Sequence, residues 1–126
     1  MRELDAKTVL AIAWHQARVS PLRPVCDVNW RIAGGLASRL AAKTGTVAWY
    51  DAKADAVVIP AQYASVCADE MYAPTITHEL THAYQCLRMG FICFQFAKTF
   101  RRRLIEAEAV REEKRAQKIL NVGVLD

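Results

Sequence analysis

Apolar residues recur at helical spacing in the first part of the chain, from Leu4 to Val19. Ser20-Pro21 and Pro24 follow this segment, and proline ends a helix because it lacks a backbone donor and clashes with the preceding turn. The pattern therefore predicts a first helix that ends near Val19. Its apolar positions are Val9, Ile12, Ala13 and Val19.

A second helical pattern extends from Asn29 to Gly45. Asn29 is a suitable N-cap, because its side chain can accept a hydrogen bond from the first turn, and Gly45 is a suitable C-cap. The pair Gly34-Gly35 opposes a helix here, since glycine has a low helix propensity. The stripe that predicts the helix consists of Trp30, Ala33, Leu36, Ala37 and Leu40.

Two short runs rich in β-forming residues follow, at Thr46 to Tyr50 and at Ala56 to Ile59. A connection from Asp51 to Asp55 separates them, and Pro60 closes the second run. This arrangement predicts a β-hairpin and, with it, a small antiparallel sheet.

The rest of the chain is predicted to be mainly helical. Pro74 suits the first turn of a helix and Gly90 its C-cap, so a third helix should lie between them. A long, highly charged helical pattern then runs from about Phe94 to Leu120, and Asn121 to Asp126 remains as a short tail. The order helix, helix, hairpin, helix, helix predicts an α+β fold in which helices pack on the small sheet.

Composition favours one globular domain, residues 1–126. Of the 126 residues, 53% are hydrophobic and 24% are charged, and no linker or internal repeat divides them. Polar residues interrupt every apolar stretch before it reaches the roughly 20 residues that cross a bilayer, so no membrane partner is expected. The first residues show no secretory signal, which favours a cytoplasmic location.

The net charge of +4 does not by itself indicate a nucleic-acid partner. The basic residues gather at Arg101 to Arg103 and in the mixed-sign run from Arg111 to Lys118. A solvated helix face explains that run more simply, so nucleic-acid binding is not favoured.

The four cysteines form no Cys-x-x-Cys pair, so free thiols are expected. They are Cys26, Cys67, Cys86 and Cys93.

The third predicted helix contains His78-Glu79-Leu80-Thr81-His82, a sequence of the form His-Glu-x-x-His. Two histidines four residues apart lie one turn apart on the same helix face, so both imidazoles can reach one ion. They fall opposite the apolar stripe of that helix, so core packing does not explain them. Glu79 stands beside them, where it can accept a proton from a metal-bound water. The motif predicts a zinc site with Glu79 as catalytic base, whereas His15 is expected to be structural.

A zinc site needs a third protein ligand, and the following helix offers Glu106 and Glu108. On a helical wheel, Glu108 shares its side with apolar residues, where a carboxylate is costly unless it is paired or metal-bound. We therefore expect Glu108 to be the third ligand, with Glu106 as the alternative. The residues near Glu108 on the wheel are Ala97, Leu104, Ile105, Glu112 and Ile119. Those near Glu106 are Arg103, Glu113 and Gln117.

Two neighbouring features refine the predicted site. Glu112, one turn after Glu108, could accept a hydrogen bond from the free ring nitrogen of a ligand histidine. The longer motif His-Glu-x-x-His-x-x-Gly-x-x-His is absent, because Gln85 and Arg88 stand at its Gly and third His positions. A metzincin site is therefore excluded.

The sequence His78-Glu79-Leu80-Thr81-His82-Ala83, followed by Glu108-Ala109-x-x-Glu112, resembles the pattern of the gluzincin zinc peptidases, both thermolysin-like and minimal. The resemblance covers the second half of the chain. It implies a zincin-like fold, with an active-site helix followed by a long C-terminal helix, and zinc held by His78, His82 and Glu108. It also implies a protein or peptide substrate that lies extended along the strand near Ala56 to Ile59.

The chain departs from thermolysin-like enzymes in one respect. No histidine follows His82, whereas those enzymes use a later histidine to stabilise the tetrahedral oxyanion. A tyrosine or zinc alone would have to serve, although the tyrosines are more simply explained by packing. The candidates are Tyr50, Tyr63, Tyr72 and Tyr84.

The sequence leaves three functions open. The first is a zinc metallopeptidase in which Glu79 activates water for attack on a peptide bond. The second is a catalytically inactive zincin-like module that binds a protein or a nucleic acid. The third, metal-dependent hydrolysis of a non-peptide amide, would use the same site. The substitution Glu79→Gln separates the first two functions, because only an enzyme needs that carboxylate.

Overall fold

The computed structural model describes residues 2–19 and 28–125, with side chains as far as residue 121. The predicted stop at Ser20-Pro21 and Pro24 and the predicted free thiol of Cys26 lie outside these residues. The elements, in chain order, are β1 (Arg2–Glu3), α1 (Ala6–Val19), β2 (Asn29–Ala33), α2 (Gly35–Thr44), β3 (Trp49–Asp51), β4 (Ala56–Pro60), the 3-10 helices η2 (Ala61–Tyr63) and η3 (Glu70–Tyr72), α3 (Ala73–Met89), α4 (Phe91–Phe100) and α5 (Arg102–Leu125). The fold class is α+β, as the sequence predicts. In the described part of the chain, no helix has the length and apolar character needed to cross a membrane.

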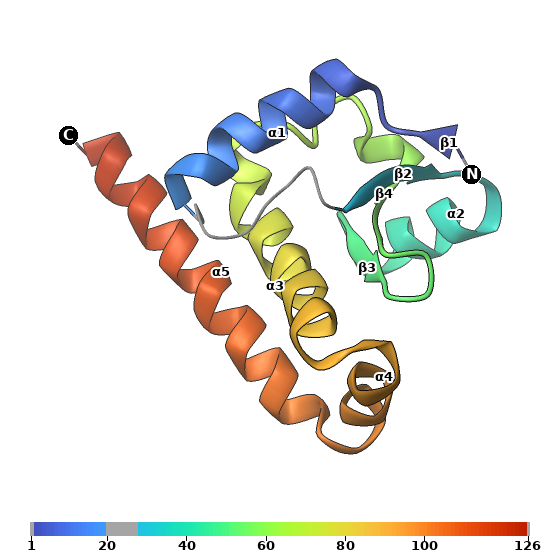
Figure 1. The fold of residues 1–126 in the computed structure, drawn as a ribbon. Coiled ribbons are helices and arrows are strands. Elements are labelled where there is room, and N and C mark those ends of the chain that lie inside the picture. The colour runs from blue at the N-terminus through green and yellow to red at the C-terminus, as the bar shows by residue number, and fades with distance from the viewer. Residues whose placement is uncertain (1, 20–27, 126) are drawn as a thin grey trace.

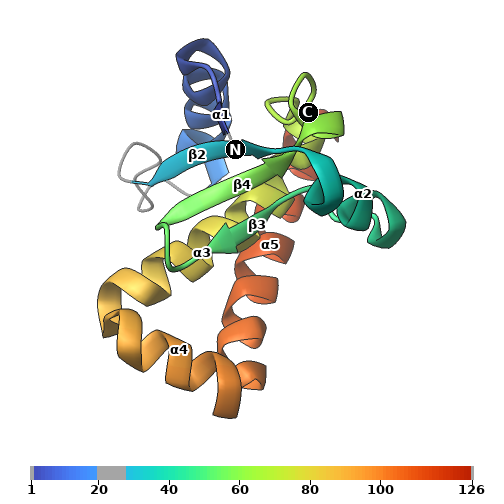
Figure 2. The ribbon, with the colours of Figure 1, turned by 90° about the vertical axis from the view of Figure 1, so that its right-hand side faces the viewer.

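The strands form one mixed sheet in the order β1-β2-β4-β3. Figure 2 shows β2, β4 and β3 side by side. β3 and β4 make the predicted antiparallel hairpin, with Tyr50 opposite Val57. β2 runs parallel to β4, with Trp30 opposite Val57, so the prediction of a purely antiparallel sheet is wrong. β4 is an inner strand, and every residue from Ala56 to Pro60 is buried. The hairpin strand at the edge of the sheet is therefore β3, and not the strand at Ala56 to Ile59 as predicted.

Residues Asn29–Ala33 form a strand rather than the first turns of the predicted second helix. Trp30 and Ile32 are both buried, and a spacing of two residues points side chains to the same face of a strand. Helix α2 begins only at Gly35, whose φ of 60° few other residues adopt, and it ends at the predicted C-cap Gly45. Pairing with β4 thus overrides the local helical pattern before the glycine pair.

Different helices cover the two faces of the sheet (Figure 2). Val57 lies in the main core with Ile76 and Leu80 of α3. Ala56 and Val58 form a small cluster on the opposite face, where α2 lies. Successive residues of a strand point to opposite faces of the sheet. The side chains of β4 therefore pack against α3 on one face and lie toward α2 on the other.

The long helix predicted from about Phe94 to Leu120 is two helices in the structure. The chain turns at Arg101, with φ −130° and ψ 34°, between α4 and α5. Helices α3 and α5 run side by side in opposite directions, and α4 links their lower ends in Figure 1. The side chain of Phe94 on α4 is buried in the main core. Helix α5 continues to Leu125, so most of the predicted tail is helical.

Candidate metal centre

Helix α3, which contains the His-Glu-x-x-His motif, lies between the sheet and α5 (Figures 1 and 2). Pro74 lies in its first turn and Gly90 at its C-terminal end, as predicted. Buried polar contacts fix its start: Gln16 of α1 donates a 3.0 Å hydrogen bond to the carbonyl of Ala73 and accepts one of 3.0 Å from Thr77. The sheet, α1 and α5 therefore hold this helix on several sides.

His78 and His82 direct their Nε2 atoms toward one carboxylate, that of Glu106. Nε2 of His82 lies 2.9 Å from Oε1 of Glu106, and Nε2 of His78 lies 3.2 Å from Oε2. The two imidazole rings are 5.0 Å apart between centroids. Glu106 on α5 therefore lies opposite the two histidines of α3 and contacts both of them.

The other nitrogen of each ring has its own acceptor. Nδ1 of His78 lies 2.7 Å from Oε1 of Glu113, and Nδ1 of His82 lies 2.9 Å from Oε1 of Gln85. A carboxylate or amide oxygen can only accept, so each Nδ1 donates a proton. In a neutral imidazole the Nε2 atom then carries a lone pair, and both lone pairs face the Glu106 carboxylate. Protonation of His82 is opposed by burial, which lowers its pKa.

Gln85 is fixed in this orientation by two further contacts. Its Nε2 donates to the carbonyl of Ile105 at 3.0 Å and to Oε1 of Glu108 at 2.7 Å, which leaves its Oε1 for His82. Glu108 also pairs with Arg88 at 3.3 Å. Glu108 thus supports His82 through Gln85, an outer role that commonly orients ligand histidines.

The structure corrects the sequence-based placement of the acidic residues on α5. Glu106, and not Glu108, reaches the histidines, and Glu113 rather than Glu112 accepts from a histidine. Glu112 instead lies 3.7 Å from Arg115. The spacing in the sequence does not choose between the two pairs, because Glu106 and Glu113 share one helix face and Glu108 and Glu112 share another.

Glu79 is half-buried beside the two histidines. Burial raises its pKa to about 7, while His78 and a hydrogen bond from the Tyr50 backbone N–H act in the opposite direction. Its Oε2 is buried and has no hydrogen-bond partner among the described residues. An unpartnered buried oxygen is costly, so this atom fits a role toward a group that the protein chain itself does not supply.

These donor atoms suit a metal ion. Ligand atoms from His78, Glu79 and His82 all lie within 4.8 Å of one another. Zinc bonds of about 2.0–2.2 Å at tetrahedral angles would separate neighbouring donors by about 3.3 Å. The distances from the two Nε2 atoms to the Glu106 oxygens, 2.9 and 3.2 Å, are close to that value. Two histidines and one carboxylate, here that of Glu106, are also a ligand set typical of catalytic zinc sites.

A pocket of about 220 Å³ opens at this cluster. Glu79, His82 and Glu106 contribute its acidic and imidazole groups. Lys98 and Arg102 bring positive charge to the same pocket. Its apolar walls come from Trp49, Tyr50, Phe94 and Ile105. The pocket therefore joins α3, α4, α5 and the edge strand β3.

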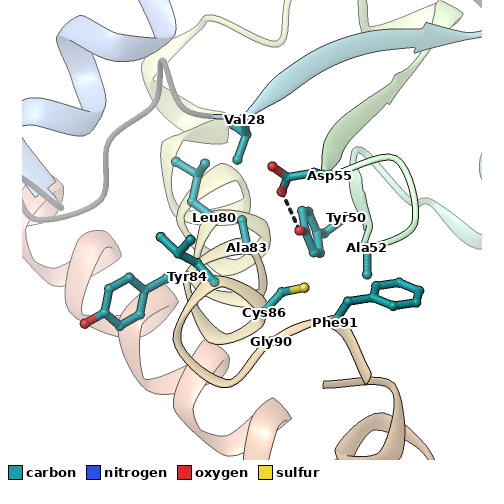
Figure 3. Close-up of a pocket in the computed structure, with 11 residues that line it drawn as sticks. Val28, Tyr50, Ala52, Asp55, Leu80, Ala83, Tyr84, Cys86, Gly90 and Phe91 are labelled. Atoms are coloured by element: carbon teal, nitrogen blue, oxygen red, sulfur yellow. Dashed lines mark hydrogen bonds between the residues drawn. The ribbon is translucent and has the colours of Figure 1, made fainter. Parts of the chain in front are cut away.

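A larger cavity, about 640 Å³, lies along α3 beside the β3–β4 turn (Figure 3). Leu80, Ala83 and Tyr84 of α3 line it, together with residues of the hairpin and Phe91. The hydroxyl of Tyr50 points into this cavity and donates a 2.6 Å hydrogen bond to Asp55 (Figure 3). This bond takes the Tyr50 hydroxyl away from the histidine pocket.

The tyrosines proposed as oxyanion stabilisers therefore receive no support from the geometry. Tyr50 lines the histidine pocket, but its hydroxyl is bonded to Asp55. Tyr63 and Tyr72 pack edge to face, with ring centroids 5.9 Å apart, and Arg88 lies over the ring of Tyr84 at 5.4 Å. Packing explains these three rings.

Two other predictions concern His15 and the thiols. His15 stacks edge to face on Trp14, with centroids 5.2 Å apart, and its buried Nδ1 has no hydrogen-bond partner in the described part of the chain. Among the described cysteines the thiols are free, as predicted: Cys67 and Cys86 are buried and Cys93 is exposed. Burial raises the pKa of the Cys67 thiol, which disfavours its thiolate.

Comparison of the chain with protein-family models, with curated proteins and with solved structures found no match. The class of the protein therefore rests on the α+β fold and on the geometry of the cluster itself.

Proposed function

We propose that this protein is a zinc-dependent hydrolase of zincin-like fold, most specifically a metallopeptidase of the gluzincin type. His78, His82 and Glu106 would hold the zinc ion, and Glu79 would serve as the general base. A protein or peptide is the proposed substrate. The proposal keeps the motif read from the sequence and replaces Glu108 by Glu106 as third ligand.

One observation carries the proposal. Both Nδ1 atoms donate to other groups, so two Nε2 lone pairs face the oxygens of Glu106 at 2.9 and 3.2 Å. Lone pairs directed at a carboxylate repel it unless a cation lies between them. Hydrogen bonds that fix the ring orientation of ligand histidines are the usual surroundings of a catalytic metal. Without a metal ion, the same contacts would require a second proton on each imidazole, and the burial that lowers the pKa of His82 opposes this for that ring.

The chemistry follows from the position of Glu79. A zinc ion held here would lower the pKa of a water molecule toward neutrality and polarise the substrate carbonyl. The unpartnered Oε2 of Glu79 accepts a proton from the attacking water and later delivers it to the leaving amine. The Tyr50 backbone N–H holds the Glu79 carboxylate in place.

The edge strand β3 supports a peptide as substrate. β3 borders the pocket through Trp49 and Tyr50, and no described strand pairs with its outer side. An extended peptide can add to such an edge by main-chain hydrogen bonds, which would lead it across the pocket. This replaces the strand at Ala56 to Ile59, which lies inside the sheet.

The test is to compare native protein with Glu79→Gln for zinc content and for peptide hydrolysis. Zinc is measured by elemental analysis after dialysis, and hydrolysis by mass spectrometry of a peptide library. We expect one zinc ion per chain in both proteins and a loss of hydrolysis of roughly 100-fold or more in Glu79→Gln. His78→Ala is the matched control, because it should lose both zinc and hydrolysis.

Two results would contradict the proposal in different ways. Native protein that holds no zinc under replete conditions would exclude the metal site. Zinc that is bound without any hydrolysis, or hydrolysis that survives Glu79→Gln, would instead favour a binding module or a different catalyst.

A further inference from the structure

Two basic side chains line the pocket at His82. Lys98 comes from the last turn of α4 and Arg102 is the first residue of α5, so the turn at Arg101 brings them to one place. Both residues are exposed. Neither side chain makes an ion pair or a hydrogen bond with another described residue. The pocket therefore contains two positive charges that the described part of the chain does not use.

Some described arginines form ion pairs and others do not, so what distinguishes Arg102 is its place in the pocket. Arg18 pairs with Glu70 at 3.3 Å, and Arg88 pairs with Glu108 at 3.3 Å. Arg102 stands one helical turn before Glu106, a spacing at which ion pairs form readily. The histidines instead hold the Glu106 carboxylate. The charge of Arg102 thus stays available although an acidic residue is near.

The charge balance of the pocket points to an anionic ligand. The pocket holds the carboxylates of Glu79 and Glu106 and the cations of Lys98 and Arg102. A divalent cation bound to the histidines and Glu106 would offset both carboxylates of the pocket, while the Glu113 carboxylate at Nδ1 of His78 lies outside the pocket lining. Two positive charges would then remain, and a cleft with charge of one sign concentrates ligands of the other sign.

The size and walls of the pocket limit what can enter. Its volume, about 220 Å³, is below the roughly 300–1,000 Å³ of pockets that enclose a whole small ligand. It fits one group of a longer molecule, held between apolar walls such as Trp49 and Phe94. A guanidinium binds a carboxylate through two parallel hydrogen bonds, and an ammonium can add a third contact.

We propose that Lys98 and Arg102 form an anion-binding subsite that selects substrates with a carboxylate next to the bond that is cleaved. The carboxylate comes either from an acidic side chain or from the C-terminus of the substrate. This inference rests on the proposed function, since it names the substrate class of the same pocket.

The test uses zinc-loaded Glu79→Gln protein, so that binding is measured without turnover. The probes are an alanine tetrapeptide with acetyl and amide ends, the same peptide with a free C-terminal carboxylate, and capped peptides with Asp at each position in turn. Binding is followed by protein tryptophan fluorescence, because Trp49 lines the pocket, and by calorimetry. The free-terminus and Asp peptides distinguish the two sources of the carboxylate.

We expect at least one anionic peptide to bind roughly tenfold tighter than the neutral one, which is the typical effect of a hydrogen bond to a charged group. Lys98→Met and Arg102→Met keep the aliphatic length and should each remove most of this preference. The controls Lys53→Met and Arg103→Met change exposed cations outside the pocket and should preserve it. Equal affinities for all peptides, or a preference that survives both pocket variants, would overturn the subsite.

Failure of the subsite and failure of the proposed function remain distinguishable. Zinc content and hydrolysis by native protein decide the function, whereas the ratio of peptide affinities decides the subsite. If the protein holds no zinc, the proposed function and the substrate selection that rests on it are both overturned, whereas bound zinc with equal peptide affinities overturns the subsite alone.

Discussion

Oε1 of Glu106 lies 2.9 Å from Nε2 of His82, although the two residues come from different helices. The contact depends on the antiparallel packing of α3 and α5 and on the turn at Arg101 that allows it. It identifies the carboxylate that completes the cluster, and it separates two acidic residues that are only two positions apart in the sequence.

The first prediction concerns these two carboxylates. Glu106→Ala should abolish zinc binding or weaken it by more than about 100-fold, because it removes a ligand. Glu108→Ala should cost about tenfold to 100-fold at most, since Glu108 acts on His82 only through Gln85. Zinc affinity is measured by competition with a chromophoric chelator. A larger loss in Glu108→Ala than in Glu106→Ala would restore the assignment made from the sequence.

The second prediction concerns Glu113, which we expect to position His78. Its Oε1 accepts a hydrogen bond of 2.7 Å from Nδ1 of His78. Glu113→Ala should weaken zinc affinity by about 10–100-fold, and Glu113→Gln should restore part of it because the amide oxygen can still accept. Glu112→Ala is the control, since Glu112 lies near Arg115 instead. Equal losses for the Glu112 and Glu113 variants would argue against this role.

Local signals in the sequence were sufficient for the helix that carries the motif and for the hairpin. Pro74 and Gly90 mark the ends of α3 through backbone chemistry that needs no tertiary contact. The tight connection between β3 and β4 is likewise local. The Asp51 carboxylate accepts a hydrogen bond of 3.1 Å from the backbone N–H of Lys53. The geometry of the two histidines follows from helical spacing alone.

The carboxylate that faces the two histidines could not be predicted in the same way, because its position depends on where α5 begins. The sequence-based wheel joined Ala97 to Glu108 in one helix, but the chain turns at Arg101. It also counted Leu104 as buried, whereas 64% of Leu104 is exposed. The buried stripe of α5 is Ile105, Ala109, Ala116 and Leu120. Relative to that stripe, Glu106 and Glu113 flank one side and Glu108 and Glu112 the other.

The parallel strand β2 shows a second limit of local pattern. Trp30 and Ile32 have the two-residue spacing of a strand, whereas Trp30 and Ala33 have the three-residue spacing of a helix. Spacing alone therefore did not decide between a strand and a helix. The pairing with β4, which lies more than twenty residues later, decides it. Such a long-range contact leaves no mark on a short window of sequence.

The third prediction concerns the packing of α3 on the sheet. Ile76→Ala should lower the free energy of unfolding by about 2–5 kcal/mol, because Ile76 is 1% exposed and its loss leaves a cavity in the main core. Leu87→Ala on the same helix should change it by no more than about 0.5 kcal/mol, since Leu87 is 74% exposed. Urea denaturation of metal-free protein measures both. Similar losses in the two variants would contradict the described packing.

The fourth prediction is a pH dependence at the start of α1. The carboxylate of Asp5 accepts a 2.8 Å hydrogen bond from the backbone N–H of Thr8 and caps the helix. This bond lowers the pKa of Asp5 below its ordinary value of 3.8. A lowered pKa in the folded state contributes stability above the unfolded value, and that contribution disappears as pH falls through the folded value.

Asp5→Ala should therefore lower the melting temperature more at about pH 6 than at about pH 3, because protonation of Asp5 removes the charge-dependent part of the cap in the native protein. Asp5→Asn is the matched control: its amide oxygen can still accept from Thr8, but it has no charge to lose. At about pH 6 the melting temperature of the native protein should be higher than that of Asp5→Asn, and this difference should shrink toward about pH 3. The difference in melting temperature between Asp5→Asn and Asp5→Ala should not change with pH. A difference between native protein and Asp5→Asn that is independent of pH would show that the hydrogen bond alone, without the charge, stabilises α1.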